Sequence, residues 1–467
     1  MFYQMRNRSS MLPILLLAVT LLLSEVAPVM LKNGAQAQAA STRQSGGAIA
    51  YIGPSEADIR LIEADGTNDR LLWQAPNLAL HRITAVDWSP DGTRLAFASN
   101  HESTCSLYRS DIYTIKPDGS DLRRVTNGPA CAGLAGYPKG SVTIEIENLL
   151  TESLFLLYIE GAANAVELPI TPGTRQQITV DNVADFGGGV QQRVVVFQTE
   201  QNSWLYPSAL VDVLPNATAV ADEFIIRSSS VQYGAYSPSW RRDGQAIGYT
   251  LGAAGAYQVS ANPGAGDQGA ALFPGGSIFG STLALSPVDD QVLLYSYPFI
   301  GLGIAGDHES VAPILELSGN LYGLDWQRDG SGLVAGEVLG LGNTHANIWR
   351  YTVGGGQIVN LTNFSDENRG YAADPSVSPD GTELVFISAP TLDADAELQI
   401  MDQHGANVRS LGVNGLYPDW GMPGQVSQPT PTPSPTATGA PPPTPTPVAT
   451  LDPNEGTSQV FLPYVQR

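Results

Sequence analysis

The sequence predicts an all-β fold: a six-bladed β-propeller closed by both termini, with an inserted small β-sandwich and a disordered Pro/Thr-rich C-terminal stalk. Three observations lead to this prediction. A hairpin pattern built around a tight turn recurs along the chain, its copies are spaced about 40–50 residues apart, and an incomplete copy stands at each end of the repeats.

The first hairpin is clearest in "AVDWSPDGTRLAFAS", residues 85–99. Val86 and Trp88 before the turn, and Leu95 and Phe97 after it, alternate with small or polar residues as in half-buried strands. In the Ser-Pro-Asp-Gly segment between them, proline presets φ and glycine accepts the left-handed conformation that ends a tight turn. The segment therefore predicts strand, turn, strand.

Copies of this hairpin start at residues 237, 282, 322 and 374, and "YPDWG" near residue 420 is a partial copy. From Trp240 the aligned positions follow at steps of 45, 41, 51 and 43 residues. Because a catalytic residue normally occurs once in a ring, the repeated acids predict turn structure and not a reaction. The shared structural positions are Trp88, Asp91, Gly92, Trp240, Asp243, Gly244, Trp326, Asp329, Gly330, Asp380, Gly381 and Trp420.

Each repeat also has a second hairpin, seen at residues 111–127, 256–273, 347–363 and 398–412. In the third unit "APILEL", residues 312–317, has no clear return strand. An N-terminal fragment, residues 47–73, lacks an innermost strand, and "YPDWG" supplies one with nothing after it. The two fragments complete a sixth blade, and a ring sealed by both termini has no free sheet edges.

Domain boundaries follow from where the repeats stop. Residues 41–132 and 227–424 form the two parts of the propeller. Residues 133–226 lack the repeat motif and contain five or more segments with strand patterns, which predicts an inserted β-sandwich; the alternative is an elaborated loop.

The two ends have compositions of their own. Residues 1–40 resemble a signal peptide, with Arg6 and Arg8 before a 13-residue apolar run and small residues after it; an uncleaved membrane anchor is the alternative. Residues 425–459 form a Pro/Thr-rich linker. The apolar tail 460–467 is too short to span a bilayer, and a sorting tag and an inert terminus both remain open.

The net charge limits the classes of partner, and the two cysteines bear on the compartment. The net charge of −22 disfavours nucleic acid and anionic membranes as partners. Cys105 and Cys131 are the two cysteines of the chain, and in an exported protein they are expected to form a disulfide; separately buried free thiols are the alternative. We expect an exported monomer without a transmembrane span in the mature chain, located outside the cell, at its surface or in the periplasm.

The repeats "WSPDGTRLAFAS" and "DIYTIKPDGSDLRRVTN" resemble the WD40-like (PD40) repeats of TolB-type six-bladed propellers. The resemblance covers about residues 47–131 and 230–424. It implies a scaffold for protein or glycan contacts, although some relatives carry peptidase or lyase activity.

No catalytic constellation stands out. The chain has no Gly-x-Ser-x-Gly motif, and its histidines, at 81, 101, 308, 345 and 404, do not pair at ligand spacing. Asp393, Asp395 and Glu397 alternate as carboxylates that suit Ca²⁺, with solvated loop acids as the alternative; no other cofactor is expected. The sequence thus predicts a non-catalytic scaffold that binds a protein or a cell-wall or extracellular glycan. The enzyme alternative is a polyuronide lyase with its site on the propeller axis.

Overall fold

The computed structural model describes residues 46–422, except 199–202, 227, 232–233, 252–254, 265–268, 275–279, 308–310 and 340–344. The expected signal peptide (1–40), linker (425–459) and apolar tail (460–467) lie outside the described residues. No helix in the described part of the chain is both long and apolar enough to cross a membrane.

The prediction of an all-β fold is confirmed, because the described chain consists of strands and turns apart from two short 3₁₀ helices, η1 (Ser103–Cys105) and η2 (Cys131–Gly136). Most repeats form one four-stranded antiparallel sheet each. The first three in chain order are β4 (Ile83–Trp88), β5 (Leu95–Ser99), β6 (Asp111–Ile115) and β7 (Arg123–Arg124); β17 (Ala235–Trp240), β18 (Ala246–Leu251), β19 (Ala256–Ser260) and β20 (Ala270–Ala271); and β21 (Thr282–Leu285), β22 (Gln291–Ser296), β23 (Phe299–Ile304) and β24 (Ala312–Glu316).

Two further groups of four are joined into one eight-stranded sheet by a single parallel pair, Ala346 with Tyr371. They are β25 (Asn320–Trp326), β26 (Gly332–Leu339), β27 (His345–Thr352) and β28 (Ile358–Asn360), followed by β29 (Tyr371–Val377), β30 (Glu383–Ala389), β31 (Glu397–Asp402) and β32 (Arg409–Asn414). In the third unit, the segment expected to lack a return strand pairs as β24 with β23.

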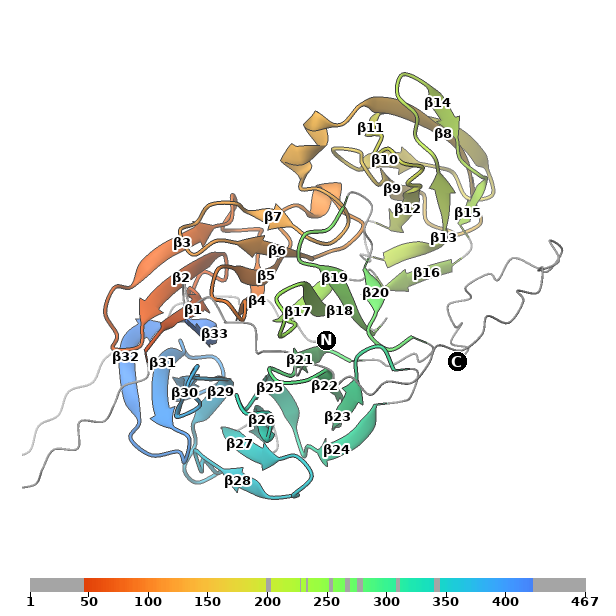
Figure 1. Cartoon of the computed structure of the whole chain (residues 1–467). Helices are drawn as coiled ribbons and strands as arrows, with labels where there is room; N and C mark the ends of the chain where they lie inside the picture. Colours follow the sequence, from red (N-terminus) through yellow and green to blue (C-terminus); the bar gives the residue numbers. More distant parts are fainter. Residues whose placement is uncertain are drawn as a thin grey trace, which may run out of the picture. The chain divides into compact units, whose positions relative to one another are not determined.

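The termini of the described chain share one sheet, in which β33 lies beside β1 (Figure 1). Its strands are β3 (Arg70–Gln74), β2 (Asp58–Glu63), β1 (Ala48–Ile52) and β33 (Leu416–Gly421), hydrogen-bonded in that order. Trp420 pairs with Ile49, is 1% exposed, and donates its Nε1–H to the carbonyl of Gly46 at 3.3 Å.

The repeated turn residues have structural partners. Asp91 Oδ1 accepts hydrogen bonds from the Ser89 hydroxyl at 2.7 Å and from the Thr93 backbone N–H at 3.0 Å. Asp243, Asp329 and Asp380 likewise accept from the backbone N–H two residues later. The glycines after these acids, Gly92, Gly244, Gly330 and Gly381, have φ between 64° and 74°. The glycine N–H also donates to the carbonyl three residues earlier, so the glycine is the fourth residue of a β-turn. The turn therefore requires both residue types: the aspartate accepts a backbone N–H, and the glycine takes the left-handed conformation.

The innermost strands, which carry the aligned tryptophan positions, contact one another in the cyclic order β4, β17, β21, β25, β29, β33 and β4. The residue just before the tryptophan position links neighbours. Asp87 accepts the backbone N–H of Trp240 and Asp419 that of Trp88, both at 2.6 Å, and Asp325 accepts that of Val377 at 2.9 Å.

Other residue types make the same link where no aspartate is present. The hydroxyl oxygens of Ser239 and Ser376 accept the backbone N–H groups of Leu285 and Trp420. Ala284 lacks such a side chain, and its carbonyl accepts the Trp326 Nε1–H instead.

Two more sheets occupy the segment expected as an insert. One contains β10 (Val166–Pro169), β9 (Leu154–Ile159), β12 (Gln192–Gln198), β13 (Ser203–Val211) and β16 (Ser228–Val231). The other contains β11 (Arg175–Ala184), β8 (Lys139–Asn148), β14 (Thr218–Val220) and β15 (Phe224–Ile226). Buried residues of both sheets share one hydrophobic cluster, as in packed layers. Because β16 pairs with β13, the inserted sheet continues beyond residue 226.

Candidate functional site

Strained backbone recurs three residues before the tryptophan position of several innermost strands. Ser237, Asp374 and Tyr417 have φ of 47–49°, and Gly323 occupies the same position in β25 with φ of 87°. Each lies where the pairing register shifts, at a β-bulge. Positive φ costs a non-glycine residue about 1–3 kcal/mol and is concentrated at functional sites. This level of the innermost strands is therefore the first place to look for one.

A pocket of about 160 Å³ lies at that level, and we call it the tyrosine pocket. Tyr322 of β25, Tyr371 of β29 and Tyr417 of β33 line it together with Asp374. Tyr322 and Tyr417 are 39% and 38% exposed, whereas Tyr371 and Asp374 are buried. The rest of the lining is small or aliphatic except for one hydroxyl: Val338, Ala373, Ile387, Ala389, Thr391, Leu392, Ala394, Ala396 and Leu416.

Among the described residues that line this pocket, Asp374 is the one with a charged side chain. Burial raises the pKa of its carboxyl to about 7, and a hydrogen bond from the backbone N–H of Tyr417 partly opposes that rise. Burial also raises the pKa of Tyr371, with a contribution from the charge of Asp393. The pocket thus combines aromatic and aliphatic walls with one desolvated carboxyl group. A ligand that supplies a positive charge or a hydrogen bond would stabilise the ionised form of this carboxyl group.

The three calcium candidates lie beside the pocket but do not converge. Asp393 and Asp395 are exposed in the turn between β30 and β31, whose Leu392 and Ala394 line the pocket. Glu397 begins β31 and accepts hydrogen bonds from Ser410 at 2.5 Å and Gln399 at 3.2 Å. Within the described residues, the group of three potential ligands whose donor atoms approach within 4.8 Å is Glu102, Cys105 and Cys131.

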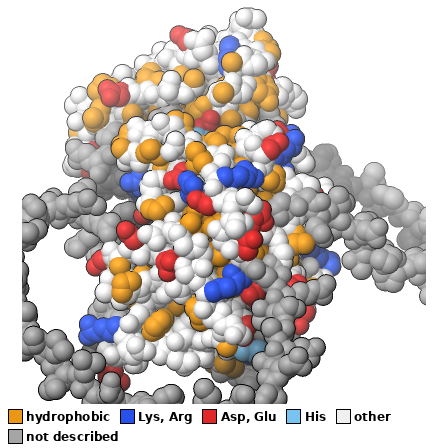
Figure 2. Space-filling model, turned by 90° about the vertical axis from the view of Figure 1, so that its left-hand side faces the viewer, with side chains coloured by type: hydrophobic (Ala, Val, Ile, Leu, Met, Phe, Trp, Pro, Cys, Tyr) orange, Lys and Arg blue, Asp and Glu red, His pale blue; other side chains and the backbone are white. Residues whose placement is uncertain are grey.

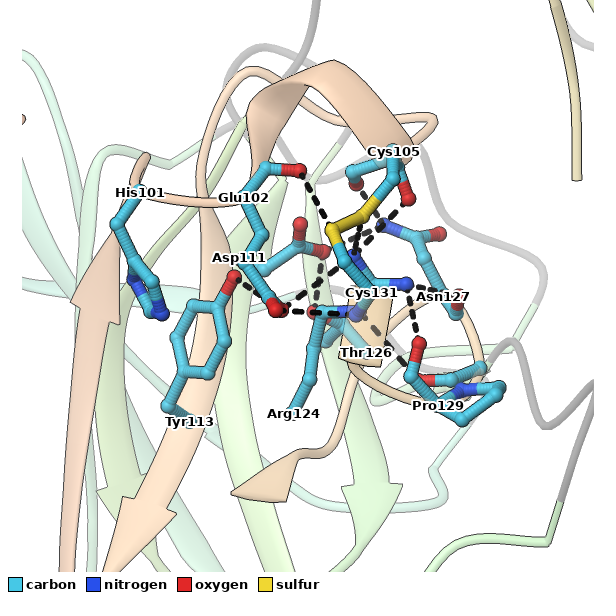
Figure 3. Close-up of polar contacts among 12 residues, drawn as sticks. His101, Glu102, Cys105, Asp111, Tyr113, Arg124, Thr126, Asn127, Pro129 and Cys131 are labelled. Carbon is cyan, nitrogen blue, oxygen red and sulfur yellow. Dashed lines mark hydrogen bonds and ion pairs between the residues drawn. A yellow bond between two sulfur atoms is a disulfide. The ribbon is translucent and has the colours of Figure 1, made fainter. Parts of the chain in front are cut away.

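That group surrounds a disulfide and not a pair of thiolates. Cys105 and Cys131 are bonded, with Cα atoms 6.0 Å apart. Figure 3 shows the buried Arg124 beside the disulfide, where its guanidinium donates to the carbonyls of Cys105 at 3.0 Å and Pro129 at 2.5 Å. Its Nη1 lies 3.8 Å from the Glu102 carboxylate. The Arg124 guanidinium is thus occupied by backbone carbonyls of two loops and by Glu102, so we assign this cluster a structural role.

Asp111 belongs to the same cluster, and its contact with a threonine has a counterpart in another repeat. Its Oδ1 accepts from the Thr126 hydroxyl at 2.7 Å and from Asn127 at 2.6 Å (Figure 3). Asn347 and Thr362 make the matching contact at 2.9 Å in the sheet that contains β27. Burial raises the pKa of Asp111, but a contact that recurs between repeats indicates a fold element.

The histidines do not assemble a metal centre in the described part of the chain. His81 and His101 have ring centroids 6.4 Å apart, and burial lowers the pKa of His101 to about 4. The Nδ1 of His345 lies 3.5 Å from Asp366, and His404 is exposed in a turn. His308 lies outside the described residues.

Surface charge gives no competing site on the face that Figure 2 shows. Acidic and basic side chains are interspersed there among hydrophobic and uncharged ones. The net negative charge of the chain is therefore not collected into one patch on that face.

Sequence reasoning did not identify the tyrosine pocket. The aligned repeats do contain a signal for it. Three residues before the tryptophan position, "YGLDW", "ADPSV" and "LYPDW" carry Gly323, Asp374 and Tyr417, although the surrounding pattern repeats. A large or charged residue at such a variable position of an innermost strand is a candidate for binding, because the frame itself does not need it.

No family model matches the chain, and no curated protein matches it. Solved structures of TolB-type and related propellers are similar to it at low sequence identity. TolB from Acinetobacter baumannii is 13% identical with a TM-score of 0.43, and the match covers 80% of this chain and 66% of that one, just under two thirds of its length. AztD from Citrobacter koseri is 11% identical with a TM-score of 0.40, over 80% and 98% of the two chains. A chain of a nidogen/laminin complex is 9% identical with a TM-score of 0.45, over 81% and 99%.

Proposed function

We propose that the protein is an exported, non-catalytic six-bladed β-propeller that binds a partner at or outside the cell surface through the tyrosine pocket. The mature chain begins near residue 41, and an inserted β-sandwich interrupts the ring between about residues 133 and 231. The Pro/Thr-rich segment 425–459 serves as a linker to the tail 460–467, which is either a sorting tag or an inert terminus.

The cyclic contacts of the innermost strands support the ring. The order β4, β17, β21, β25, β29, β33 returns to β4, and each neighbouring pair is linked by a hydrogen bond at the tryptophan position. The link between β33 and β4 joins segments 331 residues apart, through Asp419 and Trp88. Closure by both ends of the chain removes the free edges that an open array of sheets would expose.

The tyrosine pocket is the observation that carries the binding function. Three tyrosines from three different innermost strands line it, and the backbone is strained at Asp374 and Tyr417 beside them. Exposed aromatic side chains around a small apolar pocket are typical of the anchor points of protein interfaces. By contrast, the acids that recur in the repeats are occupied by backbone N–H groups, which supports a scaffold rather than an enzyme.

Binding by the mature protein to cell-wall fractions, polysaccharides and extracellular proteins tests this function. We expect Tyr417→Ala to weaken binding to the retained fraction at least tenfold, because the substitution removes one wall of the pocket. Tyr297→Ala is the matched control: Tyr297 is 68% exposed, is not in the pocket lining, and its loss should leave binding unchanged.

Equal affinities of the wild type and Tyr417→Ala for every retained fraction would overturn the assignment of the pocket. The same incubations test the enzyme alternative. Unsaturated sugar products that accumulate with time would identify a polysaccharide lyase in place of a scaffold.

A further inference from the structure

The polarity and charge of the tyrosine pocket lining indicate which chemical group it can bind. Its walls are mostly methyl, methylene and ring surfaces, including Val338, Ile387 and Leu392, and the buried Asp374 is the one charged residue among its described lining. A polyhydroxylated sugar ring needs several convergent polar partners, which these aliphatic walls do not offer. A methylene chain ending in a positive charge matches both the walls and the carboxyl group.

The surrounding charges favour a cation as well. None of the described residues that line the pocket is Lys or Arg, and the exposed acids Asp393 and Asp395 lie in the turn that borders it. Arg369 acts on Tyr371, but it is exposed and its Nε donates to the carbonyl of Asp366 at 3.2 Å. An approaching cation is therefore attracted by the rim and by the net charge of −22.

We propose that the tyrosine pocket takes a lysine side chain of a protein partner, with its methylene chain against the aliphatic and tyrosine walls and its ammonium group on the Asp374 carboxylate. This inference rests on the proposed binding function and specifies its ligand. Lysine fits better than arginine because Asp374 already accepts the backbone N–H of Tyr417, which leaves less of the carboxylate for a bidentate guanidinium pair. The tyrosine rings add a cation–π contribution.

The ionisation of Asp374 makes this pairing depend on pH. Its carboxyl has a pKa of about 7 without ligand, so it is largely neutral at pH 5 and charged at pH 8.5. Among the described residues, the other titratable groups at the pocket are Tyr322, Tyr371 and Tyr417 of its lining and the rim acids Asp393 and Asp395. Lysine binding should therefore weaken as the pH falls from 8.5 to 5.

Two small probes test the proposal by saturation-transfer-difference NMR on the mature protein. Nα-acetyl-lysine N-methylamide carries the proposed group, and Nα-acetyl-norleucine N-methylamide has the methylene chain without the charge. At pH 8.5 we expect the lysine probe to bind at least tenfold more tightly than the norleucine probe. Asp374→Asn should abolish this preference while it retains norleucine binding, because asparagine keeps an acceptor for the Tyr417 N–H but has no charge.

Variant controls separate this proposal from the function on which it rests. Tyr417→Ala should weaken both probes, and Tyr297→Ala neither. A norleucine probe that binds as well as the lysine probe in the wild type, or a lysine preference that survives Asp374→Asn, would overturn the lysine assignment but leave a binding pocket. If a sugar binds the pocket and neither probe does, the partner is a glycan and the lysine proposal is wrong. Partner binding that is indifferent to Tyr417→Ala would overturn the proposed function itself.

Discussion

Asp87 and Asp419 place carboxyl groups between neighbouring innermost strands, where each accepts a hydrogen bond at the expense of desolvating a charge. Each carboxylate accepts a backbone N–H of a neighbouring innermost strand, so each fixes the spacing of two sheets. Burial, followed by the charges of Asp419 and Asp325, raises the pKa of Asp87 well above its usual range. The hydrogen bond from the backbone N–H of Trp240 and the charge of Arg328 only partly offset this rise. The folded protein therefore favours the protonated form of Asp87.

The substitution Asp87→Asn separates the hydrogen bond from the charge. Because the pKa of Asp87 is raised on folding, its contribution to stability is fully present below its ordinary pKa of 3.8 and is lost as the pH rises through the raised value. Asparagine keeps an acceptor for Trp240 and cannot ionise. We expect the variant to melt about 1–2 °C above the wild type at pH 8, the shift that corresponds to about 1 kcal/mol for a chain of this size, and the difference to shrink towards pH 4.

The matched variant Asp87→Ala loses the acceptor as well. It leaves the N–H of Trp240 without its partner, at a cost of about 1–3 kcal/mol. A lower melting temperature for Asp87→Asn than for the wild type at pH 8 would mean that the ionised carboxylate stabilises the folded protein.

The element that connects β5 to β6 depends on covalent and polar braces, since it has little regular structure. Besides the bond to Cys131 and the contacts of Arg124, the carbonyl of Cys105 accepts the hydroxyl of Tyr158 from β9 at 2.8 Å. This bond connects the insert to the first repeat. The disulfide thus lies at the point where the inserted sheet meets the segment that precedes it.

Removing the bridge by Cys105→Ser with Cys131→Ser should lower the free energy of unfolding. In the chain-entropy model, the closed loop, whose ends are 26 residues apart, contributes roughly 3–4 kcal/mol. Denaturant unfolding of the double variant and of the wild type with and without reductant measures the difference, and unreduced peptide mapping should recover the linked pair. The prediction fails if the reductant lowers the stability of the double variant as much as that of the wild type.

The elements differ in how readily the sequence discloses them. Hairpins with alternating side chains and a Ser-Pro-Asp-Gly turn were predictable because local chemistry specifies them, as the contacts of Asp91 show. Strand β23 was missed because Gly301 and Gly303 interrupt its apolar pattern. Both glycines are required by tertiary neighbours, since a Cβ at either position would collide with Val311.

The tyrosine pocket could not be predicted at the level of one repeat, because Tyr322, Tyr371 and Tyr417 come together only when β25, β29 and β33 are neighbours. The disulfide partners, in contrast, followed from there being two cysteines in the chain. A site that depends on which sheets are neighbours can be recognised only once the order of the sheets is known.

At the scale of the whole molecule, the proposed ring depends on one short strand. β33 is the partner of β1, supplies Asp419 to the N–H of Trp88, and accepts the hydroxyl of Ser376 on Asp419 at 2.8 Å. Its Trp420 is buried in a cluster with Ile49 and Ile400. The strand thus contacts the first and the last repeats at once, and its loss should open the ring and expose the edge of β1.

Two truncations test this closure. Ending the chain after Gly424 removes only residues outside the repeats and should leave the melting temperature unchanged. Ending it after Asn414 removes β33, including a buried tryptophan whose side chain alone is worth roughly 3–5 kcal/mol. That cost approaches the total stability of many domains, about 5–15 kcal/mol, so we expect a sharply lower melting temperature or insoluble protein. Thermal melts and soluble yields of the two proteins decide the matter: coincident melting curves would mean that β33 does not close the ring and that the number of blades is not six.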